Sequence, residues 1–147
     1  MSARPLFSVI TVTYNAEEFI AQTARSVVEQ RFPNVEYLIV DGASTDRTLE
    51  RLKPFHSGIA RVISEPDNGL YDAMNKGMEL AQGQFLLFLN AGDAFIDEGV
   101  LERIARHIND RVRIVSADFV NVKSATSKQG NLIKTKACTL PNLRRDF

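Results

Sequence analysis

The chain alternates between short, nearly continuous apolar runs and longer stretches in which apolar residues recur at helical spacing. Runs at residues 7–12 (FSVITV), 35–40 (VEYLIV) and 85–89 (FLLFL) are too uniformly apolar for a strand with one face in water. They therefore predict strands buried on both faces. Weaker strand patterns lie at residues 61–64 and 113–122.

The first two helices are predicted from capping residues as well as from apolar spacing. Apolar residues between 20 and 28 fall on one helical face, and Asn15 with Glu18 forms a capping-box pattern ahead of them. Ser44 is a suitable cap for a second helix that runs to about residue 52. We therefore expect helices to begin directly after Asn15 and after Ser44.

Two further helices follow from apolar stripes at residues 70–81 and 100–108. Gly83 suits the position just past the end of the first of these. Buried strands that alternate with amphipathic helices indicate a doubly wound α/β fold, with a mainly parallel sheet and helices on both faces. In such Rossmann-like sheets, ligands bind beyond the carboxyl ends of the strands.

Composition narrows the class of protein without changing this picture. A chain of 147 residues with 44% hydrophobic and 24% charged residues fits one globular domain. Eighteen basic and eighteen acidic residues cancel, so charge does not direct the chain toward nucleic acid. The lone Cys138 forms no internal disulfide, which favours a cytoplasmic location. No apolar run is long enough to span a bilayer, so any membrane contact is expected to be peripheral.

Polar residues follow the predicted strands where each one ends. Thr13, Tyr14 and Asn15 follow the first strand, Asp41 follows the second, and Asp93 closes the Asn-Ala-Gly-Asp stretch after the fourth. Carboxylates that meet at one sheet edge repel each other unless a cation compensates them. Mg²⁺ and Mn²⁺ prefer oxygen ligands, and a magnesium-like ion usually shares its shell with substrate phosphates. The pattern therefore predicts a nucleotide diphosphate site with Asp93 as metal ligand.

Each of these residues also has a purely structural explanation. Asp41-Gly42 is a common turn pair, and Asp93 suits the cap of a following helix. A tyrosine such as Tyr14 is often found without a ligand. These alternatives stay open for each residue taken singly, and their coincidence at successive strand ends weighs against all of them together.

The chain resembles a known enzyme family in three stretches that occur in order. These are VITVTYNAEEFIAQTARSVVEQ, YLIVDGASTDRT and SEPDNGLYDAMNKGMELAQGQFLLFLNAGD, and the resemblance as a whole covers residues 7 to about 110. They resemble the family 2 inverting glycosyltransferases of GT-A-type fold, especially enzymes that build bacterial surface polysaccharides. The resemblance implies transfer of a sugar from a nucleotide-diphosphate donor to a saccharide or lipid-linked acceptor, with Mn²⁺ or Mg²⁺. A lipid-linked acceptor would place the enzyme at the inner face of the membrane.

The resemblance also implies roles for individual residues. Asp93 corresponds to the family's metal ligand on the donor diphosphate. The expected nucleotide and donor contacts are Thr13, Tyr14, Asn15, Asp41, Asp72 and Asn75. Residues 1–122 would form the nucleotide-sugar-binding domain, and residues 123–147 would begin an acceptor-side region that looks truncated.

Three departures from the family pattern affect these expectations. Relatives often carry two consecutive acids where this chain has Asp41-Gly42, and Asp-Ala-Asp-Asp where it has Asn90-Ala91-Gly92-Asp93. A single carboxylate should bind metal weakly without donor. The family's general base lies downstream of residue 147, so no catalytic base is assigned.

Two other function classes are alternatives to sugar transfer. The absent base favours a nucleotide-sugar-binding module or fragment without transfer activity. A nucleotidyltransferase would share the sheet and the metal, but it would need a glycine-rich basic loop to hold triphosphate, and VTYNAEEF contains neither glycine nor lysine.

A sheet with exposed apolar edges would also favour self-association of the chain.

Overall fold

The computed structural model describes residues 4–109. Within this part of the chain, a four-stranded sheet has the order β3-β2-β1-β4, and every neighbouring pair is parallel. The strands are β1 (Phe7–Thr13), β2 (Val35–Asp41), β3 (Arg61–Ser64) and β4 (Phe85–Phe88). The predicted parallel α/β sheet is confirmed, while the strand expected at residues 113–122 lies outside the described residues.

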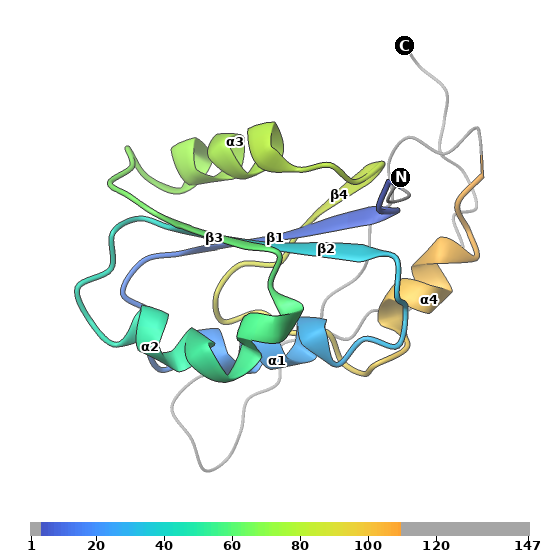
Figure 1. Cartoon of the computed structure of the whole chain (residues 1–147), viewed down its shortest axis with the longest axis horizontal. Coiled ribbons are helices and arrows are strands. Elements are labelled where there is room, and N and C mark those ends of the chain that lie inside the picture. The colour runs from blue at the N-terminus through green and yellow to red at the C-terminus, as the bar shows by residue number, and fades with distance from the viewer. Residues whose placement is uncertain (1–3, 110–147) are drawn as a thin grey trace.

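Helices cover both faces of the sheet, as the sequence predicts. They are α1 (Ile20–Val28), α2 (Thr48–Leu52), α3 (Leu70–Leu80) and α4 (Val100–Ala105), with a 3-10 helix, η1 (Lys53–Gly58), directly after α2. Figure 1 shows α3 on one side of the sheet and α1, α2 and η1 on the other.

β1 and β2 read as apolar runs because each face of the sheet has its own core. The expectation that the run at residues 85–89 is buried on both faces is wrong, because Leu86 and Phe88 of β4 are exposed. In β1, Phe7 and Val9 belong to the larger core, which also contains residues of α1 and α4, whereas Ile10 and Val12 pack in a smaller core beneath α3. All seven residues of β1 are buried. Side chains alternate between the two faces of a strand, so a strand covered on both faces is apolar at consecutive positions.

Two glycines allow close contacts that keep α3 and β4 against β1. A Cβ on Gly77 of α3 would stand 2.5 Å from the Ile10 Cγ2 atom, and a Cβ on Gly83 would stand 2.4 Å from the backbone nitrogen of Ser8. The expectation that Gly83 follows the helix end directly is wrong, because α3 ends at Leu80 with Ala81 in an extended conformation as its cap. Gly83 is instead required by the close approach of two backbones.

Among residues 4–109, no helix has the length and apolar character needed to cross a bilayer.

Candidate functional site

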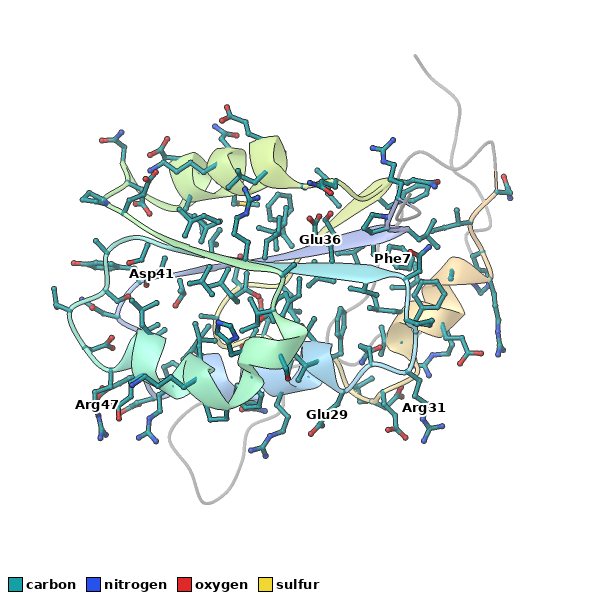
Figure 2. The ribbon with its side chains drawn as sticks, in the orientation of Figure 1. Phe7, Glu29, Arg31, Glu36, Asp41 and Arg47 are labelled. Carbon is teal, nitrogen blue, oxygen red and sulfur yellow. The ribbon has the colours of Figure 1, made fainter. Side chains whose placement is uncertain are left out.

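The strand ends predicted to converge do lie on one rim of the sheet. Thr13 is in register with Asp41, and Asp41 is in register with Ser64. Beyond β4, the Ala91 backbone nitrogen donates to the Val12 carbonyl over 3.3 Å, which brings the following turn to the end of β1. Figure 2 shows Asp41 at the opposite end of the sheet from Phe7.

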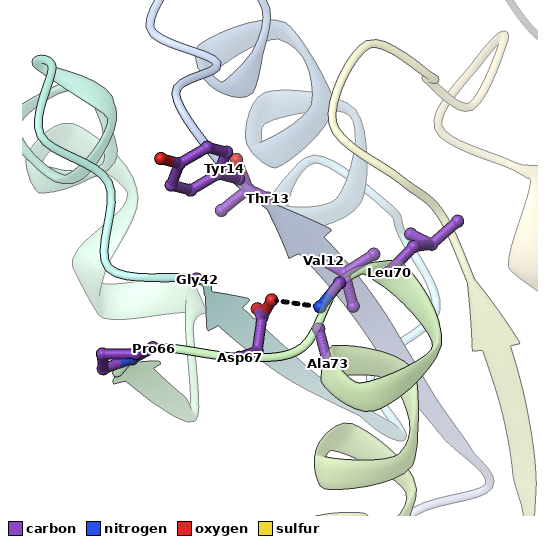
Figure 3. Close-up of a pocket in the computed structure, with 9 residues that line it drawn as sticks. Val12, Thr13, Tyr14, Gly42, Pro66, Asp67, Leu70 and Ala73 are labelled. Atoms are coloured by element: carbon purple, nitrogen blue, oxygen red, sulfur yellow. Dashed lines mark hydrogen bonds between the residues drawn. The ribbon is translucent and has the colours of Figure 1, made fainter.

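A pocket of about 560 Å³ opens at this rim, between the end of β1 and the start of α3. Figure 3 shows the aromatic ring of Tyr14 and the carboxylate of Asp67 on different sides of it, with Gly42 nearby. Tyr14 is 64% exposed, so its ring is free to stack on a ligand. The described residues that line the pocket are Val12, Thr13, Tyr14, Gly42, Pro66, Asp67, Gly69, Leu70 and Ala73.

Asp41 is completely buried beneath this pocket edge, and both of its carboxylate oxygens are engaged. Oδ2 accepts from the Ser44 backbone nitrogen at 2.9 Å and from the Ser64 hydroxyl at 2.6 Å. Oδ1 accepts from the Ser44 hydroxyl. Several hydrogen bonds to one buried carboxylate compensate the loss of its hydration. Asp41 therefore organises the loop that follows β2.

Asn15 joins the loop after β1 to the loop after β2. Its backbone nitrogen donates to the Ser44 hydroxyl at 2.8 Å, and its side-chain oxygen accepts from the Thr45 backbone nitrogen at 2.9 Å. The predicted capping box of Asn15 and Glu18 is wrong, because α1 begins at Ile20 without a side-chain cap. Asn15 adopts a φ of 46°, a left-handed conformation that asparagine tolerates better than most residues.

A second set of contacts ties the same two loops together. The Thr48 hydroxyl accepts from the Ala16 nitrogen at 2.8 Å, and Asp46 Oδ2 accepts from the Glu17 nitrogen at 3.1 Å. Asp46 Oδ1 accepts from the Thr48 nitrogen at 2.9 Å, at the start of α2. The prediction that Ser44 caps this helix is therefore wrong, because the side chain of Asp46 makes the contacts at the helix start.

The turn that carries Asp93 is held by a helix residue that the sequence analysis missed. The Asp93 nitrogen donates to the Asn90 carbonyl at 2.9 Å, and Gly92 has a φ of 102°. The buried Thr23 hydroxyl of α1 accepts from the Gly92 nitrogen at 3.0 Å and donates to the Asp93 carbonyl at 2.7 Å. Thr23 could have been noticed as a polar residue on the buried face of a predicted helix.

The Asp93 carboxylate is half-buried, and within residues 4–109 it has no hydrogen bond or ion pair. Burial raises the pKa of this carboxyl above its usual value. Asp93 does not cap the following helix, since the cap of α4 is Gly99. The helix-cap alternative for Asp93 is therefore wrong.

The turn offers oxygen atoms that would suit a hard metal ion. Asn90 Oδ1 is buried without a hydrogen-bond partner among the described residues, as is the Thr13 hydroxyl on the adjacent strand. With the carboxylate of Asp93, this set contains the oxygen ligands that Mg²⁺ and Mn²⁺ accept. No cluster of three or more His, Cys, Asp or Glu residues occurs in the described range.

Asp72 and Asn75 lie on α3 but do not line the pocket described above. Asp72 Oδ2 accepts from the Asn68 backbone nitrogen at 3.0 Å and lies 3.7 Å from Lys76 Nζ. Asn75 is exposed. The structure thus brings Thr13, Tyr14 and the Asp93 turn to one rim, and it places Asp72 in the hydrogen bonding that precedes α3.

Comparisons with known proteins point to one family. A family model described as "Glycosyl transferase family 2" matches residues 8–146. A "PGL/p-HBAD biosynthesis glycosyltransferase" of Mycobacterium bovis is 36% identical over 111 residues, which are 74% of this chain and 43% of that protein. The "Putative teichuronic acid biosynthesis glycosyltransferase TuaG" of Bacillus subtilis is 41% identical over 93 residues, 61% of this chain and 37% of that one. The chain thus spans less than half the length of these relatives.

Solved structures agree with the fold. S. aureus TarS in complex with UDP-GlcNAc matches with a TM-score of 0.63 and 31% identity, over 68% of this chain and 30% of that chain. The mannosyltransferase PcManGT from Pyrobaculum calidifontis, in complex with GDP-Man and Mn²⁺, matches with a TM-score of 0.67 and 24% identity. The latter match covers 82% of this chain and 37% of that chain, and it supports the α/β fold.

Proposed function

Because the chain belongs to glycosyl transferase family 2, we propose that it takes part in moving a sugar from a nucleotide-diphosphate donor to a saccharide or lipid-linked acceptor. The reaction would invert the anomeric centre and serve surface polysaccharide synthesis, as the resemblance and the names of the relatives suggest. With a lipid-linked acceptor, the protein would work at the cytoplasmic face of the membrane.

The observation that carries this proposal is the joint position of the pocket and the Asp93 turn beside the end of β1. The pocket has an exposed tyrosine ring and mostly uncharged walls, which suit a nucleoside. The Asp93 turn offers a free carboxylate next to that pocket, which suits a metal-bound diphosphate. The complex of TarS with UDP-GlcNAc supports a donor of this class.

Each rim residue would then have its own role in donor binding. Tyr14 would stack on the nucleoside, and Thr13 would form part of the wall beside it. Asn15 is engaged with the neighbouring loop through Ser44 and Thr45, so it would fix the backbone on which Tyr14 stands. Donor contacts by Asp72 and Asn75 remain predictions.

Asp93 would hold Mn²⁺ or Mg²⁺ on the donor diphosphate, together with oxygen ligands such as the Asn90 side chain. Such an ion, when bound, supplies Lewis-acid stabilisation of the negative charge that develops on the leaving diphosphate. Thr23 would keep the carboxylate in place by holding both residues of the turn. The acceptor hydroxyl must lose a proton, and we assign no residue to that step.

Calorimetric titration of the chain with UDP, GDP and dTDP, each with and without Mn²⁺, tests the proposal. We expect one of the diphosphates to bind more tightly in the presence of Mn²⁺, and Asp93→Asn to remove that difference while the circular dichroism spectrum is unchanged. Glu102→Gln is the matched control, because Glu102 is an exposed acid of α4 that pairs with Arg106 away from the rim. Absence of metal-dependent binding for all of them would contradict the proposal.

A second measurement separates transfer from mere binding. The alternative, a nucleotide-sugar-binding module without transfer activity, predicts donor binding without release of nucleoside diphosphate. We therefore propose to incubate the chain with a UDP-sugar and Mn²⁺, with and without saccharide acceptors, and to follow UDP release. Binding without release under all conditions would favour the module.

A further inference from the structure

Two carboxylates lie near the pocket at the end of β1, and they differ in whether a bound ligand could contact them. Asp67 is the charged residue among the described residues that line the pocket, whereas Asp41 does not line it. Asp41 is completely buried and its two oxygens are bonded to Ser44 and Ser64. Because Asp41 is completely buried and absent from the pocket lining, a ligand in the pocket could reach it only after the loop that covers it had moved.

Asp67 fills the space next to Gly42 that a side chain at position 42 would occupy. A Cβ built on Gly42 would stand 2.6 Å from Asp67 Oδ2 and 3.2 Å from its Cγ. The φ of Gly42 is outside the left-handed region, so the backbone does not require glycine there. Glycine at this position leaves the space that the Asp67 carboxylate occupies, and a Cβ would displace the carboxylate.

One oxygen of Asp67 is available to a ligand. Oδ1 accepts from the Gly69 backbone nitrogen at 2.8 Å, just before α3 begins (Figure 3). Within residues 4–109, Oδ2 has no hydrogen-bond partner, and Asp67 is half-buried. A partly desolvated carboxylate oxygen accepts strongly from N–H and O–H groups and repels phosphate. The pocket therefore favours the donor groups of a nucleoside over a diphosphate.

We propose that Asp67 Oδ2 accepts a hydrogen bond from the nucleoside of the donor, and that Asp41 is a positioning residue that acts through Ser44. This inference rests on the proposed function and assigns to Asp67 the contact that the family resemblance implies for Asp41. Ser44 links the two loops, since its hydroxyl donates to Asp41 and accepts from the Asn15 nitrogen. Asp41 thereby fixes the loop next to Tyr14 without touching the ligand.

The first test compares UDP with inorganic pyrophosphate, which lacks the nucleoside, at constant Mn²⁺. Asp67→Asn replaces one carboxylate oxygen by an NH2 group, so the side chain can no longer accept with one oxygen from the Gly69 nitrogen and with the other from the ligand. We expect its affinity for UDP to fall about 10-fold, which corresponds to about 1.4 kcal/mol, because a hydrogen bond to a charged group is lost. The affinity for pyrophosphate should stay the same or rise, because a negative charge has been removed.

Glu65→Gln is the matched control for charge, because Glu65 is exposed, pairs with Lys76 at 3.0 Å and does not line the pocket. It should change the affinity for UDP less than twofold. Gly42→Ala provides a second, independent variant, since its Cβ displaces the Asp67 carboxylate without removing the charge. It should weaken UDP binding as Asp67→Asn does, and it should likewise spare pyrophosphate.

The second test is a double-mutant cycle on UDP affinity with Asp41→Asn and Ser44→Ala. If Asp41 acts through Ser44, Asp41→Asn should add less than a twofold loss in the Ser44→Ala background. A direct contact between Asp41 and the nucleoside would instead give losses that multiply. Thermal unfolding of the same variants shows whether each one is folded under the binding conditions.

The outcomes separate this inference from the proposed function. UDP binding that Asp67→Asn leaves unchanged, or an equal loss for UDP and pyrophosphate, would overturn the role of Asp67 and leave the proposed function standing. Multiplying losses in the cycle would overturn the role of Asp41. If the unsubstituted chain binds no nucleoside diphosphate, both the proposed function and this inference fail.

Discussion

Two residues near the rim are in unfavourable environments: Asp93 has a half-buried carboxylate, and Ala43 has a left-handed backbone conformation. Burial raises the pKa of Asp93, and within the described residues no partner compensates its charge. The ionised form is thus less favourable in the folded chain than in the unfolded chain, where the carboxyl has a pKa of about 3.9. Asp93 consequently destabilises the fold at neutral pH, and this effect fades as the pH falls through the raised pKa of the folded chain and is absent below the unfolded value.

Asp93→Asn should therefore raise the thermal unfolding midpoint by a few degrees at pH 7 in the absence of metal. The difference from the unsubstituted chain should shrink as the pH is lowered toward 4, since the carboxyl then becomes protonated in both states. Circular dichroism melts at several pH values measure this directly. A lower midpoint for Asp93→Asn at pH 7 would mean that the carboxylate has a stabilising partner.

Ala43 is a second strained residue, with a φ of 61° in the loop after β2. A left-handed conformation costs an L-residue about 1–2 kcal/mol, while glycine adopts it freely but loses more entropy on folding. Ala43→Gly should therefore stabilise the chain by roughly 0.5–1 kcal/mol in urea unfolding. Ala60→Gly is the control, because Ala60 is exposed with an ordinary φ, and it should be neutral or destabilising.

The sequence predicted that the polar residues of the rim would converge, but not what each would contact. Asn15, Ser44 and Asp41 all looked like local caps or ligand contacts. In the structure, Asn15 bonds to residues 29 and 30 positions away, and the Ser44 hydroxyl joins it to Asp41. Local sequence carries no signal for such partners, because they are set by the pairing of β1 with β2.

At the scale of elements, the strand bounds were predictable. Continuous apolar runs identified β1, β2 and β4 to within one residue, and the weaker pattern at residues 61–64 matched β3. The helix starts were less predictable. Helix α1 begins at Ile20 because the Ala16 carbonyl accepts from the nitrogens of Phe19 and Ile20, while the residues before it are held by the neighbouring loop.

The link between α3 and β4 depends on a glycine that touches β1. A Cβ on Gly83 would come within 2.4 Å of the Ser8 nitrogen and 2.7 Å of the Phe7 carbonyl carbon, and neither backbone atom can move easily. Gly83→Ala should therefore destabilise the chain by about 1–3 kcal/mol, as overpacking does. Gln84→Ala is the neighbouring control at an exposed position and should stay within about 0.5 kcal/mol. Urea unfolding of both variants measures the difference.

For the whole molecule, the parallel α/β class could be predicted but the strand order could not. Buried strands look alike in sequence, so nothing indicated that β1 lies between β2 and β4. The pocket could not be predicted either, because Asp67 and Gly42 lie in separate segments and no sequence motif indicates that they are in contact. What the sequence did predict is the rim, since parallel strands all end at one edge.

The edge of the described sheet favours association between copies of the chain. In β4, an outer strand of the described sheet, Leu86 and Phe88 are 40% and 36% exposed. Exposed apolar edge strands pair readily with one another. We expect sedimentation velocity to show concentration-dependent dimers and Leu86→Lys to weaken them. A monomer at all concentrations would contradict this prediction.

The central place of β1 has a consequence for biosynthesis. This strand leaves the ribosome first among the strands, yet its neighbours are completed only at Asp41 and Phe88. During translation it is therefore a mainly apolar segment, and the hydrogen-bonding edge that pairs with β4 stays open until Phe88 has been added. A slow codon before Phe88 would prolong that interval and the exposure of the open edge to aggregation.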